Sequence, residues 1–140
     1  MTTVSHKPPG TLGLRHLALQ VKNLEACEHF YTKLLGMQLV WRPDSDNIYL
    51  SSGTDNLALH RAALNFEPSR HQHLDHLGFF VKEKTEVDAW HDYLSAEGVT
   101  IQAKPKDHRD GTRSFYCVDP DGNVVQLIWI PEMDPSLRSG

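Results

Sequence analysis

Histidine is the residue type whose placement in this chain points most directly to chemistry. The 140 residues include nine histidines, and His76 stands inside the otherwise apolar run LDHLGFFV (74–81). Burying an imidazole there without a partner costs about 1–3 kcal/mol on protein-based scales. A neutral imidazole nitrogen is also a favoured ligand for zinc, nickel and iron. His76 is therefore either a hydrogen-bonded core histidine or a metal ligand.

The segment around His76 has a counterpart earlier in the chain. LRHLALQVKNLEACEHFYTKLLG (14–36) aligns with LDHLGFFVKEKTEVDAWHDYLSAEG (74–98), so that His16 matches His76. Internal similarity of this kind indicates a duplicated supersecondary unit. Two imidazoles on matching strands of a pseudo-symmetric pair can converge on one point, as a metal ion requires. The duplication therefore favours a metal-binding interpretation of this pair.

Each copy shows the same order of elements: an apolar strand, a helix and three short strands. We expect Asn23 and Thr85 to cap the two helices, and Gly36 and Gly98 to end them in the left-handed conformation. The expected short strands are 37–41, 47–52 and 56–62 in the first copy, and 99–103, 113–118 and 123–130 in the second. This order predicts a pair of βαβββ units.

Length and composition limit the remaining alternatives. The chain has the size of one ordinary domain. Its mixed charge (net -4) lacks the basic excess that is typical of a nucleic-acid-binding surface. No apolar run approaches the roughly 20 residues of a membrane span. We expect a leader at 1–11, modules at 12–63 and 74–131, a linker at 64–73 and a tail at 132–140.

The cellular compartment is predicted from the leader and the cysteines. The leader is expected to be flexible, because it lacks the hydrophobic region of a signal peptide. The two cysteines lie inside predicted elements and suggest no disulfide framework. We therefore expect a cytoplasmic protein.

This combination resembles the vicinal oxygen chelate superfamily, which includes glyoxalase I, extradiol dioxygenases, fosfomycin-modifying transferases and bleomycin-resistance proteins. The resemblance covers roughly residues 12–131 and rests on the duplicated module, the helix end FYTKLLGM and the closing segment GTRSFYCVDPDGNVVQLIW. It implies an α+β fold of two βαβββ modules with curled mixed sheets and outer helices. It further implies a cup for a divalent metal, a small-molecule substrate and a homodimer, with sites often assembled from modules of two subunits. The superfamily supports several chemistries on one scaffold, so the resemblance specifies the fold better than the activity.

The resemblance places the metal ligands on the first and last strands of the modules. The first-strand positions are His16 and His76, and the last-strand position is Gln126 in the second module and Ala58 in the first. Enzymes of the superfamily usually carry glutamate where this chain has Gln126. An amide oxygen can coordinate a metal, but it is neutral and cannot act as a general base. The positive charge of a zinc, nickel, iron or manganese ion held by His16, His76 and Gln126 would not be compensated by these neutral ligands. The ion would therefore favour anionic ligands.

Further candidates lie on the predicted strands. His60 follows Ala58 by two residues and faces the same way. It is either a fourth ligand or base, or an exposed histidine at a strand end, and neither interpretation is favoured. Tyr116 is the candidate catalytic hydrogen-bond donor, and Ser114 shares its strand face as a substrate-binding residue.

Two aromatic residues and one more histidine complete the set. Trp41 and Tyr49 are candidates for the wall of a pocket for an apolar part of the substrate, although aromatics on such strands more often belong to the core. His108 stands in a polar loop, and a solvated histidine is favoured there over an acid–base group.

Two classes of function follow. The first is a metal-dependent enzyme, either a glyoxalase-like lyase or dioxygenase-like, whose metal acts as a Lewis acid on vicinal oxygens of a small substrate. The alternative is a metal-free binding protein that sequesters a small molecule, like the bleomycin-resistance members. The paired histidines and His60 favour the enzyme, whereas Gln126 and Ala58 favour the binder. We expect the enzyme; the sequence identifies neither the substrate, nor the metal, nor any use of glutathione.

Overall fold

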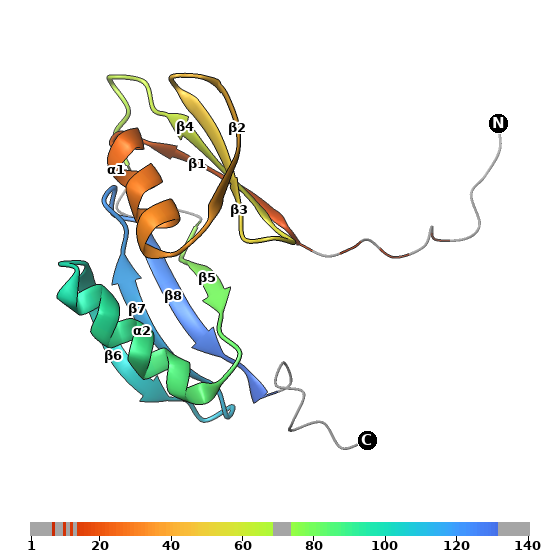
Figure 1. Ribbon diagram of the computed structural model, residues 1–140, viewed down its shortest axis with the longest axis vertical. Coiled ribbons are helices and arrows are strands. Elements are labelled where there is room, and N and C mark those ends of the chain that lie inside the picture. Colours follow the sequence, from red (N-terminus) through yellow and green to blue (C-terminus); the bar gives the residue numbers. More distant parts are fainter. Residues whose placement is uncertain (1–6, 8–9, 11, 13, 69–73, 132–140) are drawn as a thin grey trace.

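The computed structural model describes residues 7, 10, 12, 14–68 and 74–131, which form two four-stranded sheets with helices packed against them (Figure 1). The first sheet has the strand order β1 (His16–Val21), β4 (Asn56–Arg61), β3 (Asn47–Ser51), β2 (Gln38–Asp44). The second repeats it as β5 (Leu77–Phe80), β8 (Val124–Trp129), β7 (Arg113–Val118), β6 (Thr100–Asp107). In each sheet the first and last strands of the module pair in parallel, and the other neighbours are antiparallel. The predicted α+β fold of two βαβββ modules is confirmed.

The helices largely follow the predicted signals. The first module has α1 (Leu24–His29), continued by the π-helical turn η1 (Phe30–Leu34), and the second has α2 (Lys84–Ala96). Gly36 and Gly98 follow them with φ of 86° and 83°, the left-handed conformation that glycine adopts without steric cost.

The predicted cap at Thr85 is wrong. The N-cap of the second helix lies two residues earlier, at Glu83. Glu86 Oε2 accepts the backbone N–H of Glu83 at 3.0 Å, as part of a capping box that satisfies donors at the helix start. Asn23 does occupy the N-cap of α1, but its side chain makes no capping hydrogen bond.

Strand alternation gives each sheet two distinct faces. In β1, Leu19 and Val21 are buried while His16 is exposed. In β7, Arg113 is on the helix-covered face, where it pairs with Asp88 of α2. We call the opposite, uncovered side the open face of each sheet.

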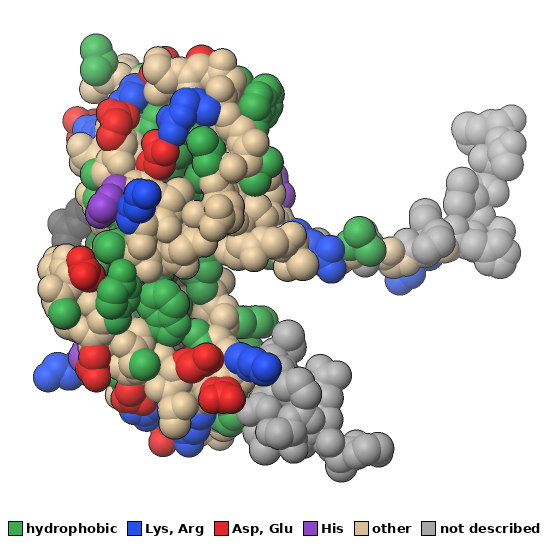
Figure 2. All heavy atoms as spheres, viewed as in Figure 1, with side chains coloured by type: hydrophobic (Ala, Val, Ile, Leu, Met, Phe, Trp, Pro, Cys, Tyr) green, Lys and Arg blue, Asp and Glu red, His purple; other side chains and the backbone are tan. Residues whose placement is uncertain are grey.

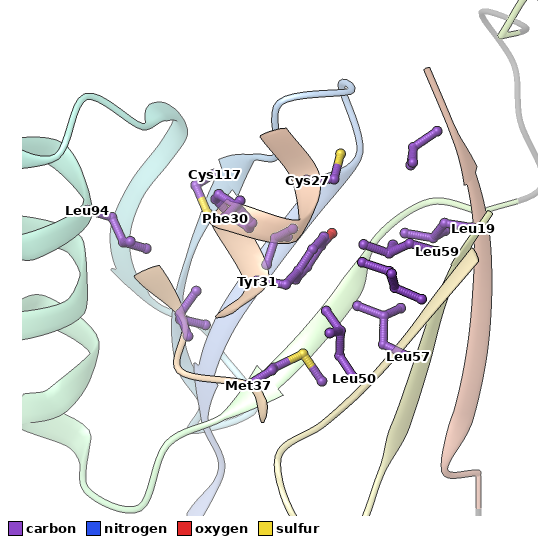
Figure 3. Close-up of a cluster of buried hydrophobic side chains, with 14 of the residues drawn as sticks. Leu19, Cys27, Phe30, Tyr31, Met37, Leu50, Leu57, Leu59, Leu94 and Cys117 are labelled. Carbon is purple, nitrogen blue, oxygen red and sulfur yellow. The ribbon is translucent and has the colours of Figure 1, made fainter. Parts of the chain in front are cut away.

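One hydrophobic cluster runs through both modules, with α1 and η1 at their junction (Figures 1 and 3). Figure 3 shows Phe30 and Tyr31 of η1 among side chains contributed by both sheets. At the same junction, Asp121 Oδ1 accepts the backbone N–H groups of Lys22 and Asn23, each at 2.9 Å.

Acidic and basic side chains are interspersed over the view in Figure 2, in keeping with the small net charge.

Candidate functional site

His16 and His76 line the same cleft, which we call the junction cleft because it lies between the starts of the two modules. Its volume is about 320 Å³. The junction cleft is mostly apolar, with a polar minority; its other lining residues are Leu14, Arg15, Leu17, Met37, Asp55, Asn56, Leu57, Leu74, Leu77, Gly78 and Phe79. The strand predicted over 74–81 begins only at Leu77, so His76 precedes it in the chain. The two duplicated imidazoles thus share one cavity of a single chain.

Each of these histidines is oriented by an oxygen acceptor. His16 Nδ1 lies 2.8 Å from Asn56 Oδ1, and His76 Nδ1 lies 2.7 Å from Asp75 Oδ2. Because an amide or carboxylate oxygen only accepts, Nδ1 carries a hydrogen in both rings, and in the neutral form of each ring the lone pair is on Nε2. A metal-bound histidine usually donates its other ring N–H to an oxygen acceptor in this way.

Gln126 is buried on the open face of the second sheet, with its amide held by two hydroxyls. Its Nε2 donates to Ser114 Oγ at 3.0 Å and to Tyr116 Oη at 3.1 Å. Its Oε1 lies beside Gly78, the register partner of Gln126, where an added Cβ would stand only 3.4 Å away. The missing side chain at position 78 therefore leaves space beside the amide oxygen.

The second-sheet candidates form one cluster. The rings of His76 and Tyr116 meet edge to face, with centroids 5.3 Å apart. Ser114 and Tyr116 share the open face with Gln126, as strand alternation predicted. In the first module the register pairs Ala58 with Ala18, so Ala58 holds the position equivalent to Gln126.

Gln126 and Tyr116 also line a second cavity of about 810 Å³, which we call the polar cleft. Its other lining residues are Lys106, Asp107, His108, Arg109, Asp110, Thr112 and Ile128. The guanidinium of Arg113 hydrogen-bonds Asp107 and lowers the pKa of that carboxyl, and bonds from Thr112 lower the pKa of Asp110. Among the described residues, no carboxylate lies within 4.0 Å of Lys106 or Arg109 to form an ion pair. The polar cleft therefore carries two cationic and two anionic side chains.

The first-sheet candidates lie apart from this cluster. His60 Nδ1 is 2.6 Å from Asn47 Oδ1, and the His60 ring meets Tyr49 edge to face at 6.0 Å. Trp41 stacks on Tyr49 at 5.2 Å and is 58% exposed. His60, Tyr49 and Trp41 line neither the junction cleft nor the polar cleft.

The interpretation of His108 as a solvated histidine is wrong. The residue is half-buried, and its Nε2 lies 2.8 Å from Ser114 Oγ. Asn56 and Asp75, which orient the two cleft histidines, were also not recognised from the sequence. Asn56 shares a strand face with Ala58. Asp75 directly precedes His76. Both positions could therefore have been recognised from the sequence pattern. His108 could not, because its partner depends on how the loop folds over the sheet.

A divalent metal is implied by the resemblance, and the polar atoms of this cluster test whether one fits. In the described part of the chain, no three His, Cys, Asp or Glu side chains gather as a metal site. The three predicted ligands each have one polar atom bonded within the protein and a second with a lone pair: Nε2 of His16, Nε2 of His76 and Oε1 of Gln126. By chemical type this donor set fits a divalent cation, although all three donors are neutral. In this chain the two histidines line the junction cleft, whereas Gln126 lines the polar cleft.

Comparisons with known proteins identify the family. The family model of the Glyoxalase/Bleomycin resistance protein/Dioxygenase superfamily matches residues 13–127. The chain is 31% identical over 115 residues to the glutathione transferase FosA of Serratia marcescens, covering 81% of this chain and 78% of that protein. It is 29% identical over 124 residues to a biphenyl-2,3-diol 1,2-dioxygenase of Sphingomonas paucimobilis, covering 86% of this chain but only 40% of the dioxygenase.

The fold agrees with solved structures. A lactoylglutathione lyase from Agrobacterium tumefaciens superposes with a TM-score of 0.70 at 25% identity, over 88% of this chain and 96% of the lyase. Within the described residues, no helix is long and apolar enough to cross a membrane. The resemblance seen in the sequence is confirmed: the chain belongs to the Glyoxalase/Bleomycin resistance protein/Dioxygenase superfamily.

Proposed function

We propose that this chain is a metal-dependent enzyme that acts on a small anionic substrate with two adjacent oxygen atoms. His16, His76 and Gln126 would hold the metal. The observation that supports this most strongly is that each of the three side chains is bonded within the protein through one polar atom and has a second atom able to coordinate a metal. A bound divalent metal supplies Lewis-acid polarisation of the substrate oxygens.

The neutral donors favour an anionic substrate. Two imidazoles and an amide cancel none of the charge of a dication, so the substrate has to balance it. The polar cleft, which Gln126 and Tyr116 line, carries Lys106 and Arg109 beside Asp107 and Asp110, so the expected preference for an anion rests on the neutral donors. A carboxylate, phosphonate or deprotonated diol is therefore favoured over a neutral substrate.

Tyr116 is suited to donate a proton in a hydrogen bond to the substrate. Its hydroxyl oxygen accepts from Gln126 Nε2, so its own hydrogen remains available. Ser114, which accepts from the same nitrogen, is buried and positions the amide. Tyr116 would thus stabilise negative charge that develops on a substrate oxygen, as a preorganised donor does in other enzymes.

The chemistry of Gln126 narrows the reaction class. An amide cannot take up a substrate proton, and it does not complete the two-histidine-one-carboxylate set typical of iron oxygenases. The first fact disfavours a glyoxalase-like lyase that uses this ligand as the base, and the second disfavours oxygen insertion, so a group-transfer reaction is favoured. The comparison with the transferase FosA, which covers 78% of that protein, is in keeping with this choice.

We also propose a homodimer. The open faces carry exposed apolar side chains, including Trp41 and Phe80, each 58% exposed. Burying such side chains against a second copy would be favourable. In a dimer that joins the open face of the first sheet to that of the second, His60 and Tyr49 of one subunit would approach the Gln126 cluster of the other.

Metal analysis of untagged protein tests the proposed function. We expect one zinc, nickel, iron or manganese ion per chain, lost in His76→Ala and retained in the control His29→Ala, which changes an exposed histidine of α1. Protein that purifies without metal and binds none of the four added ions would contradict the proposal.

A metal-free binding protein is the second candidate. The mainly apolar junction cleft favours it, because such a cleft can hold a small molecule by burial alone. If this candidate is right, ligand binding will persist in a strong chelator and will survive His76→Gln.

A further inference from the structure

Three side chains from different parts of the second module form a continuous hydrogen-bonded chain. His108, in the loop after β6, lies with Nε2 2.8 Å from Ser114 Oγ of β7. Ser114 Oγ is in turn 3.0 Å from Nε2 of Gln126 on β8. Ser114 is 1% exposed, so water is largely excluded from competing for its hydroxyl.

The directions of these hydrogen bonds follow from counting protons. The amide nitrogen of Gln126 carries two hydrogens and no lone pair for accepting, so Ser114 and Tyr116 must both accept from it. The single hydrogen of the Ser114 hydroxyl is then directed elsewhere. His108 Nε2 is the acceptor within reach, which requires a neutral ring with its proton on Nδ1.

The opposite direction would turn the amide around. If His108 donated from Nε2, the hydrogen of Ser114 would be free to point at Gln126. The favourable partner for that hydrogen is the amide oxygen, and the NH₂ group would then be directed toward Gly78. An amide NH₂ group does not coordinate a cation, so the two arrangements differ in whether position 126 can be a ligand.

We propose that His108 and Ser114 are positioning residues that fix the amide of Gln126 with its oxygen toward the space beside Gly78. The inference rests on the proposed function, in which this oxygen is a metal ligand. His108 touches neither metal nor substrate in this role. It acts through Ser114, by accepting the proton that would otherwise favour the flipped amide.

Nuclear magnetic resonance of the full, metal-free protein tests the orientation directly. We expect His108 to show a protonated Nδ1 and an unprotonated Nε2 in its ring nitrogen spectrum. The side-chain NH₂ signals of Gln126, assigned by their loss in Gln126→Glu, should shift in His108→Leu and in Ser114→Ala. In His108→Gln, whose amide oxygen can take the place of Nε2 as acceptor, these signals should stay near their original positions.

Calorimetric titration of the same variants with Zn²⁺ tests the consequence. We expect His108→Leu and Ser114→Ala to bind about 10–100-fold more weakly, the usual effect of losing an outer partner of a metal ligand. His108→Gln should recover most of the affinity, and the exposed control His29→Leu should match the parent protein. Because Ser114 is buried, His108→Leu provides the decisive comparison if Ser114→Ala does not fold.

The outcomes separate this inference from the proposed function. A His108 ring protonated on Nε2, or Gln126 signals unchanged in His108→Leu, would overturn the positioning role even if the protein binds Zn²⁺. Expected spectra in a protein that binds no Zn²⁺ would overturn the proposed metal enzyme and leave the amide orientation supported.

Discussion

The hydroxyl of Tyr31 donates a hydrogen bond of 2.8 Å to Oδ2 of Asp119, joining the helical segment of the first module to the hairpin turn of the second. Both residues are buried, at 0% and 3% exposure. Burial, with the negative charge of Asp119 beside it, raises the pKa of Tyr31 well above its usual value, so the hydroxyl keeps its proton. Asp119 also accepts backbone N–H groups of Asp121 and Asn123, at 2.8 and 2.9 Å. One carboxylate thus shapes the turn and holds the two modules together.

Removing the Tyr31 hydroxyl is expected to destabilise the protein. Tyr31→Phe leaves the ring packing intact but deprives a buried carboxylate of one donor, which costs about 1–3 kcal/mol of unfolding free energy. Urea denaturation measures this loss. The control Tyr93→Phe removes an exposed hydroxyl on α2 and should change little. Equal stabilities of the two variants would show that the bond to Asp119 does not contribute.

A carboxylate at position 126 is expected to tighten metal binding. In Gln126→Glu the hydroxyls of Ser114 and Tyr116 can both donate to the new carboxylate, so it remains positioned. Its negative charge offsets part of the charge on the cation, and we expect at least about tenfold higher affinity, or 1.4 kcal/mol. Titration with Zn²⁺ measures the change.

The matched control is Gln20→Glu, which adds the same charge at an exposed position of β1. If both substitutions raise the affinity equally, the effect is general electrostatics. An affinity that is unchanged or lower in Gln126→Glu would place position 126 outside the coordination shell.

The ion pairs of Arg113 predict a pH-dependent contribution to stability. Its hydrogen bonds lower the pKa of Asp88 and of Asp107 below the usual value of an aspartate. A carboxyl whose pKa is lowered by folding stabilises the protein above its unfolded pKa, about 3.9, and this contribution is lost as the pH falls through the folded value. Arg113→Met should therefore lower the urea midpoint at pH 7.

That difference should shrink as the pH falls below about 3.9 and then through the lowered pKa values of Asp88 and Asp107, where both carboxyls become protonated in the parent protein as well. The control Lys104→Met removes an exposed charge from β6. A difference between parent and Arg113→Met that stays constant down to pH 2 would mean that packing of the arginine stem matters instead of its charge.

The two cysteines are expected to be unreactive in the folded protein. Burial raises the pKa of Cys27 and of Cys117 to about 12, and both thiols are free. At pH 8 only about one molecule in 10⁴ carries the reactive thiolate at either position. A chromogenic disulfide reagent should label neither thiol at pH 8 and both in urea. Rapid labelling of one thiol without urea would show that this part of the core opens.

Much of the fold could be predicted because its signals are local or repeated. The duplication fixed the order of elements, Gly36 and Gly98 marked the helix ends, and alternation placed Ser114 and Tyr116 on one strand face. Each inference needs only residues close in sequence, or a comparison of one copy with the other. Even so, the N-cap of α2 is Glu83 and not Thr85. The two candidate caps lie two residues apart, and the capping box at Glu83 satisfies more backbone donors than a single cap at Thr85 would.

The amino-acid sequence by itself determined that there are two equivalent modules, that each begins near a histidine, and that the second ends with Gln126 where the first has Ala58. The shared cleft of His16 and His76 was expected from the duplication, whereas tertiary structure alone decided that Tyr31 meets Asp119 and that His108 meets Ser114. These contacts join residues on different elements, and their geometry depends on how the sheets, α1 and the loop after β6 pack together. Periodicity along a strand gives the face on which a side chain lies, whereas its partner across space is set by packing.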